Sequence, residues 1–450
     1  MLRPLLYANK KVIIMLFLVS SLIFLYYLSV NYNVNYYDEK GYLNISKKIL
    51  ANGLFSINEP LRTYFYPLVL SCVSIFTNGD AHVIKIIMSV FQYLFYVYTI
   101  WFVAAKSFEY SNNKRSVLYS ILFFGFLNPY LIQSTTLFLT DVLASCCVIL
   151  ALTYLVFGNF ERNKTYILIF GFSYVSTMIR PSSIVIIPVI IMLIIVRKII
   201  IKDVNLSKGL VFGISALVIF FPQLYNNVIQ FNDWTPLVHS DLYEFQSNLA
   251  ASNLKYGTVV IPNEAPQLFY PSPYLVDSLE IGILELIFVN FPAFLVAYSS
   301  HLFGVLDWGY IETYINDYYP ISRIFGSLFL YLFWITSFYG LYKFIRNERS
   351  VQARFFVASF IGTFAVYWLF IGTTIIESRF GYPLYFMILP FSGYCLWSWL
   401  EFWRNRDMQN AFKMKKTMTY LFVSAALIAL LFYLSFLLDY QTGRINWLGF

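Results

Sequence analysis

Eleven apolar runs, each close to the length that crosses a bilayer, constrain this chain more than any other feature. A membrane-spanning helix needs roughly 20 mostly apolar residues. Only 12% of the 450 residues are charged, about half of the share that soluble domains carry. So few charges argue against soluble enzymes and nucleic-acid binders. We predict an all-α polytopic membrane protein with spans at 12–30, 82–105, 117–134, 141–158, 165–180, 182–196, 209–223, 324–342, 355–373, 382–400 and 418–437.

The distribution of charge predicts the orientation. With the N-terminus in the cytoplasm, the cytoplasmic segments hold 21 of the 31 Lys and Arg but only 6 of the 23 Asp and Glu. Basic residues are retained in short cytoplasmic loops. The net charge of +8 therefore reports orientation, and no nucleic-acid partner is expected. The cytoplasmic segments are 1–11, 106–116, 159–164, 197–208, 343–354 and 401–417.

Two long external segments, 31–81 and 224–323, interrupt the spans, and the second of them divides the chain into three parts. We expect an N-terminal transmembrane core over 1–223 that includes the first external loop, 31–81; an external module over 224–323; and C-terminal transmembrane helices over 324–450. Residues 39–51 carry apolar positions at helical spacing, which predicts an amphipathic helix. The apolar stretches 67–77 and 286–305 are interpreted as helices at the external interface.

Carboxylates concentrate at the predicted external surface. Asp38 and Glu39 follow the first span, where charge at a helix N-terminus is the ordinary explanation. Asp141 opens the fourth span with apolar sequence on both sides. A helix N-cap would account for Asp141, but ionisable residues at such depth usually mark a site.

Three arginines lie on the same predicted side as these carboxylates. Arg62 is in the first loop, Arg180 joins the fifth and sixth spans, and Arg379 precedes the tenth span beside Glu377. Each could extend its side chain to lipid headgroups. Together they could also hold a lipid-linked phosphate, because guanidinium groups match phosphate oxygens.

These stretches resemble motifs of the GT-C superfamily of membrane glycosyltransferases, in the branch of protein O-mannosyltransferases and aminoarabinose transferases. The order and sidedness of the stretches carry the resemblance. They are Asp38-Glu39 with Tyr42, Arg62 with Tyr66-Pro67, Leu139-Thr140-Asp141, Arg180-Pro181, and Glu377-Ser378-Arg379-Phe380 with Pro383.

The resemblance implies transfer of a sugar from a polyprenyl-phosphate carrier to a glycan, lipid or protein acceptor on the external face. The acceptor hydroxyl needs a base, whereas the phosphate leaving group needs no general acid. We expect inversion with Asp38 as base, and Glu39 or Asp141 orienting the acceptor or tuning Asp38. Arg379 and Arg180, with Arg62 as a further candidate, would bind the phosphate. The substrate-binding candidates are Tyr42, Tyr66 and Glu377.

No cofactor is required, although Asp38 and Asp141 could together bind a divalent metal. Richness in Ile, Asn, Lys and Tyr suggests a bacterial inner-membrane protein with a periplasmic or extracellular site. Two alternatives stay open. An O-antigen polymerase or ligase would centre on arginines and on His239 or His301 of the large external loop. A transporter without chemistry would show internal symmetry and charges near the midplane of its spans.

Overall fold

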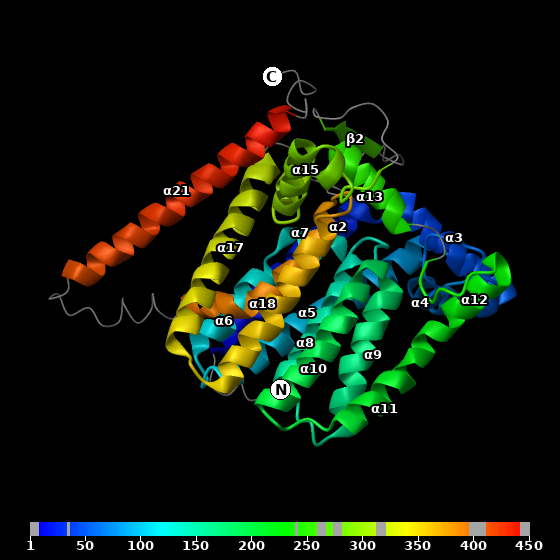
Figure 1. Ribbon diagram of the computed structural model, residues 1–450, viewed down its shortest axis with the longest axis horizontal. Coiled ribbons are helices and arrows are strands. Elements are labelled where there is room, and N and C mark those ends of the chain that lie inside the picture. Colours follow the sequence, from blue (N-terminus) through cyan, green and yellow to red (C-terminus); the bar gives the residue numbers. More distant parts are fainter. Residues whose placement is uncertain are drawn as a thin grey trace.

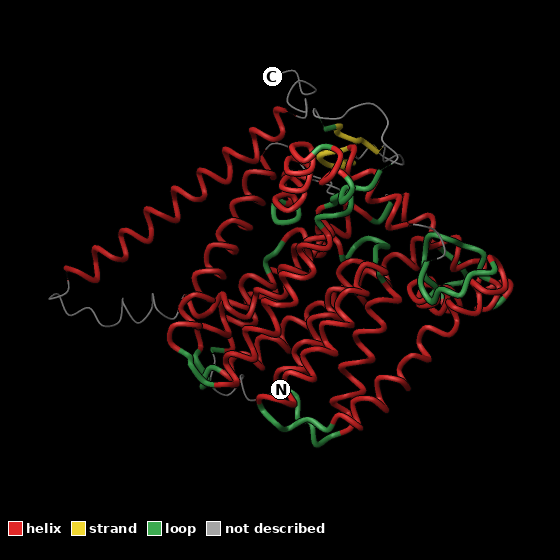
Figure 2. Tube along the Cα trace, in the orientation of Figure 1, coloured by secondary structure: helices red, strands yellow, loops and turns green. Residues whose placement is uncertain are grey.

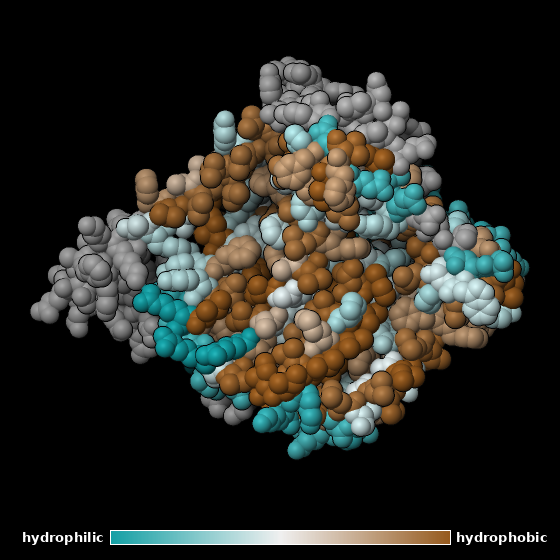
Figure 3. Space-filling model, in the orientation of Figure 1, coloured by the Kyte–Doolittle hydropathy of each residue, from teal (hydrophilic) through white to brown (hydrophobic). Residues whose placement is uncertain are grey.

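The computed structural model describes residues 9–33, 37–238, 242–258, 267–272, 281–311, 321–395 and 411–441. Helices dominate this part of the chain, and one two-stranded sheet lies near one end of the bundle (Figure 2). Figure 3 shows apolar atoms over the middle of one face and hydrophilic atoms along its lower edge. This banding fits a protein embedded in a bilayer.

The N-terminal part forms a tightly packed helical bundle. Helix α8 lies at its centre and is buried from Asp141 to Thr153, packed against α5, α9 and α19. The elements in order are α2 (Lys10–Asn31), α3 (Tyr37–Asn52), η1 (Leu54–Ser56), α4 (Phe65–Phe76), α5 (Ala81–Tyr110), α6 (Arg115–Phe126), α7 (Pro129–Ser134), α8 (Asp141–Phe157), α9 (Asn163–Ile179), η2 (Pro181–Val185), α10 (Ile186–Ile200), α11 (Leu206–Ala216), η3 (Leu217–Phe220) and α12 (Phe221–Phe231).

The middle part combines short helices with a hairpin that the sequence did not reveal. Strand β1 pairs antiparallel with β2, so this module is not purely helical. The predicted interfacial helix over 286–305 is broken at Asn290, whose side chain accepts a hydrogen bond from the Ala293 N–H at 3.2 Å and so starts a new helix. The elements are α13 (Leu242–Ser252), β1 (Asn253–Thr258), β2 (Gln267–Pro271), α14 (Leu286–Val289), α15 (Phe291–Gly304) and α16 (Trp308–Ile311).

The C-terminal part completes the bundle and adds one outlying helix. Figure 1 shows α21 leaning away from the other helices, with α17 beside it, and among the described elements its main packing partners are α17 and α16. The elements are α17 (Ile321–Asn347), α18 (Val351–Ile371), η4 (Ser378–Gly381), α19 (Tyr382–Ile388), η5 (Leu389–Phe391) and α21 (Ala411–Gln441).

Each predicted span contains helix in the residues that the structure describes; residues 396–400 of the tenth lie outside them. Seven helices in the described part are long and apolar enough to cross a membrane. In the described residues, the other four predicted spans hold helices of at most 17 residues. In one of them Asn128 caps a new helix that starts at Pro129. The chain is thus an integral membrane protein, and the count of eleven spans stays a prediction.

Candidate active site

Arg379, in the segment that connects α18 to α19, lies at the centre of a charged cluster. It belongs to the single turn η4, which packs tightly against α16: a Cβ at Gly381 would lie 2.4 Å from Trp308 Nε1. Only glycine therefore lets η4 approach this closely. The approach turns the Arg379 side chain toward α3 and α8, which lie far away in sequence.

Three carboxylates surround the Arg379 guanidinium. Its Nη2 donates to Asp38 Oδ2 at 2.8 Å, and its Nε donates to Glu377 Oε2 at 2.6 Å. Its Nη1 reaches Asp141 Oδ2 at 3.4 Å. One guanidinium thus joins the start of α3, the start of α8 and the segment before η4. The structure brings together three of the carboxylates that the sequence singled out.

Arg62 holds the other oxygen of Asp38. Its Nη2 donates to Asp38 Oδ1 at 3.0 Å, and its guanidinium carbon lies 5.4 Å from the centre of the Tyr42 ring. Gly41 makes room for this arrangement, because a Cβ there would lie 2.7 Å from Arg62 Cζ. The first turn of α3 therefore presents Asp38 between two arginines.

Arg180 forms a matching contact with Asp141. Its Nη1 is ion-paired with Asp141 Oδ1, and its Nε donates to Ser182 Oγ at 2.9 Å. The guanidinium carbon also lies 4.3 Å from the centre of the Phe380 ring. Since Asp141 has no exposed side-chain surface, this arginine neutralises a carboxylate that would otherwise be costly to bury.

The cluster is nearly balanced in charge and partly open. The side chains of Asp38, Arg62 and Arg379 are 20%, 16% and 11% exposed, so small polar molecules can reach them. Burial acts to raise the pKa of Asp38, but the positive charges of Arg379 and Arg62 outweigh it and lower that pKa below its ordinary value of 3.8. Asp38 is therefore a carboxylate whose two oxygens are both engaged in this state.

Glu39 points away from the cluster. Its carboxylate binds Lys85 Nζ of α5 at 2.9 and 3.1 Å and accepts the Phe138 backbone N–H at 2.6 Å. Both members of the ion pair are almost fully buried. Glu39 thus connects α3 to α5 and to the segment that leads into Asp141, and it does not line the cluster with Asp38.

The two candidate tyrosines sit at different depths. Tyr42 lies beside Arg62 and contacts the Tyr66 ring edge-on at 5.2 Å. Tyr66 is fully buried, and its hydroxyl is hydrogen-bonded to Gln92 at 3.3 Å. Tyr42 therefore borders the cluster, whereas Tyr66 is buried behind Tyr42 and supports it by packing.

The sequence analysis assigned no role to two side chains that support the site. Lys85 lies in the first turns of α5, within an apolar run, and a charge in such a run is itself a signal that it needs a partner. Phe380 appeared only as part of the motif around Arg379; the centre of its ring lies 4.3 and 5.8 Å from the guanidinium carbons of Arg180 and Arg379.

The residues present do not form an evident metal site. Among the described residues no group of three His, Cys, Asp or Glu is arranged to hold a metal ion. Asp38, Asp141 and Glu377 do converge, but on the Arg379 guanidinium, which occupies the position of a cation. We therefore assign no step to a metal.

The histidine alternative finds no support in the cluster. His301 is buried, which lowers its pKa, and its ring nitrogens lie 3.1 and 2.9 Å from the backbone oxygens of Gly372 and Asn253. It ties the middle module to the end of α18. His239 lies outside the described residues.

Comparison with known proteins identifies the fold. No family model matches the chain, and no curated protein matches it. ArnT from Cupriavidus metallidurans, solved with undecaprenyl phosphate, matches with a TM-score of 0.51 at 11% identity, over 86% of this chain and 60% of that one. The oligosaccharyltransferase AglB from Archaeoglobus fulgidus, solved with an inhibitory peptide and a dolichol-phosphate, matches with a TM-score of 0.52 at 12% identity, over 96% of this chain and 56% of that one.

Both structures belong to GT-C membrane glycosyltransferases, and a second AglB structure, with Zn and sulfate, matches with a TM-score of 0.51 at 12% identity, over 95% of this chain and 53% of that one. This chain therefore has the GT-C fold of a helical polytopic membrane protein, as its motifs predicted. It spans 60% or less of the length of each of these structures.

Proposed function

We propose that this protein is a glycosyltransferase that moves a sugar from a polyprenyl-phosphate donor to an acceptor hydroxyl, with inversion and with Asp38 as the base. The main observation behind this proposal is that Arg379 contacts both Asp38 and Asp141 in one partly exposed cluster. The cluster thus offers a proton acceptor and phosphate-binding cations side by side. The GT-C fold, shared with structures that contain undecaprenyl phosphate or a dolichol-phosphate, supports this chemistry.

The proposed reaction is a single displacement. The acceptor oxygen attacks the anomeric carbon, and its proton passes to the Asp38 carboxylate as the new C–O bond forms. The bond between the sugar and the phosphate oxygen breaks, and its electron pair stays on the polyprenyl phosphate. Arg379 and Arg180 bind the phosphate and stabilise the charge that grows on it.

The resting contacts of Asp38 suggest how the base becomes available. Both of its oxygens are held by Arg379 and Arg62, which leaves a poor proton acceptor. A donor phosphate would compete for these guanidiniums, since phosphate accepts the same paired hydrogen bonds. Donor binding would thus weaken the hold on Asp38 and make it more basic before the acceptor reacts.

The connections of the helices support an external site. Helix α8 begins at Asp141 and runs toward the basic segment 159–164; α9 begins within that segment, at Asn163, and ends at Ile179, directly before Arg180. Helix α18 likewise begins within the basic segment 343–354, at Val351, and leads to η4 and Arg379. The cluster therefore lies at the opposite end of these helices from the segments predicted to be cytoplasmic. A membrane-impermeant maleimide should label Lys47→Cys in intact cells, and not Lys202→Cys, both in a cysteine-free background.

The function is tested with Asp38→Asn, assayed with a panel of polyprenyl-phosphate sugars. Loss of a general base should lower kcat about 10²–10⁴-fold while donor binding is retained. Asp203→Asn is the matched control, because Asp203 also pairs with an arginine, Arg197, at 2.6 Å. Arg197 donates to the Leu155 and Val156 oxygens, at the opposite end of α8 from Asp141. Wild-type transfer by Asp38→Asn would refute Asp38 as base, and no transfer by the wild-type chain from any donor would refute the function. The acceptor, whether glycan, lipid or protein, is then identified from the product.

A further inference from the structure

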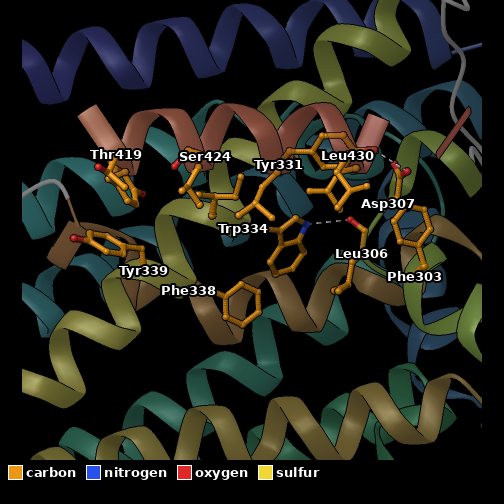
Figure 4. A pocket seen from close by; sticks show the side chains of 15 residues that line it. Phe303, Leu306, Asp307, Tyr331, Trp334, Phe338, Tyr339, Thr419, Ser424 and Leu430 are labelled. Atoms are coloured by element: carbon orange, nitrogen blue, oxygen red, sulfur yellow. Dashed lines mark hydrogen bonds between the residues drawn. The ribbon is translucent and has the colours of Figure 1, made fainter. Parts of the chain in front are cut away.

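A cavity of about 920 Å³ separates the outlying helix α21 from α17. Figure 4 shows Tyr339 and Thr419 toward one end of this cavity and Asp307 and Phe303 toward the other. Its walls are almost wholly apolar, with Trp334 pointing inward between them. Both walls belong to helices that are long and apolar enough to cross a membrane.

The cavity is elongated along the helices. On α21 its lining extends from Thr419 to Leu431, which is about 18 Å of helix at 1.5 Å per residue. Its long axis therefore follows α21, which supplies the longer of the two helical walls. Because α21 is long and apolar enough to cross a membrane, an acyl chain of a bilayer lipid can lie along it.

The end near Asp307 is closed by satisfied polar groups. Asp307 Oδ2 accepts the Tyr331 hydroxyl at 2.8 Å, and Trp334 Nε1 donates to the Leu306 oxygen at 3.0 Å. These groups therefore need no water in the cavity. A slot this apolar within the hydrocarbon region is poorly suited to water, which needs several polar partners.

We propose that this slot, bounded by Tyr331–Tyr339 of α17 and Thr419–Leu431 of α21, binds one acyl chain of a bilayer phospholipid. The acyl chain lies along α21 and completes the packing of this helix, since only 6% of its membrane-spanning stretch is buried in the protein. The lipid thus acts as part of the structure. The assignment does not depend on the transfer reaction.

The tail of a donor held at Arg379 is separated from the slot by a packed wall. The Trp308 ring is fully buried and contacts the Tyr382 ring at 4.9 Å. Behind it, η4 lies directly against Trp308 at Gly381. The direct path from a phosphate at Arg379 to the slot passes through this wall, whereas a phospholipid can enter from the side of the bilayer.

The test uses the full chain in phosphatidylcholine vesicles that contain a phosphatidylcholine with a photoreactive acyl chain. After illumination, mass spectrometry locates the labelled residues. Slot residues such as Val423 should be labelled more strongly than Phe422, which is 75% exposed but lies outside the slot. Equal labelling at the two positions would overturn the proposal, and this comparison needs no substitution.

A filling variant provides the second arm. Leu427→Trp should occupy the slot and abolish its labelling. Leu421→Trp is the matched control, since Leu421 and Leu427 are both 43% exposed on α21 but only Leu427 lines the slot; it should label as the wild type does. Retained slot labelling in Leu427→Trp would overturn the proposal. So would stronger labelling by a photoreactive polyprenyl phosphate at the same mole fraction, which would assign the slot to the donor.

Discussion

Replacing Lys85 by methionine tests how α3 is held in place. Lys85 and Glu39 are 1% and 0% exposed and 2.9 Å apart, so Lys85→Met leaves a buried carboxylate without its counter-charge. Breaking such a pair costs about 3–5 kcal/mol. The double variant Glu39→Gln/Lys85→Met removes both charges, and the amide oxygen can still accept the Phe138 N–H. It should therefore recover most of the lost stability.

The assay is chemical denaturation of the purified protein in detergent micelles. Lys106 and Glu109 supply the control, because they are also 2.9 Å apart but 32% and 28% exposed. Lys106→Met should cost no more than about 1 kcal/mol. The reasoning is refuted if Lys85→Met costs no more than Lys106→Met, or if the double variant is as unstable as the single one.

The remaining predictions concern the arginines, the base and the histidine. Gly41→Ala places a Cβ against Arg62 and should displace its guanidinium from the donor phosphate. Loss of one charge-assisted hydrogen bond, ~1.5–3 kcal/mol, should raise the donor KM about 10–100-fold. In the Arg62→Ala background, Gly41→Ala should change the donor KM no further. Burial acts to raise the pKa of Asp38, but the two flanking arginines together have the larger effect, so this pKa lies below 3.8. The ion pairs therefore stabilise the fold fully above that pH, and this contribution is lost as the pH falls through the lowered pKa. Arg62→Gln removes one attraction, so the acid limb of kcat/KM should move to higher pH. His301→Ala should lower the Tm and leave sugar transfer intact; loss of transfer with an unchanged Tm would favour the polymerase alternative.

The helical architecture was largely predictable because it depends on the local pattern of apolar and polar residues. The apolar runs located the helices, and the period of residues 39–51 located α3. The hairpin of β1 and β2 and the break at Asn290 were missed. The hairpin lies in a polar part of the middle module, where no long apolar period marks the strands, and the break at Asn290 lies inside an apolar stretch that predicts one continuous helix.

The sequence by itself determined that this chain enters a membrane as a set of helices, and it named the acids and arginines that converge. Hydrophobic length and charge are local properties, so they can be read without a fold. The tertiary structure decided the pairing: Arg379 reaches Asp38 across 341 positions, whereas the adjacent Glu39 turns to Lys85. On a helix, neighbouring side chains point about 100° apart, and only the packing of other helices decides what each one meets.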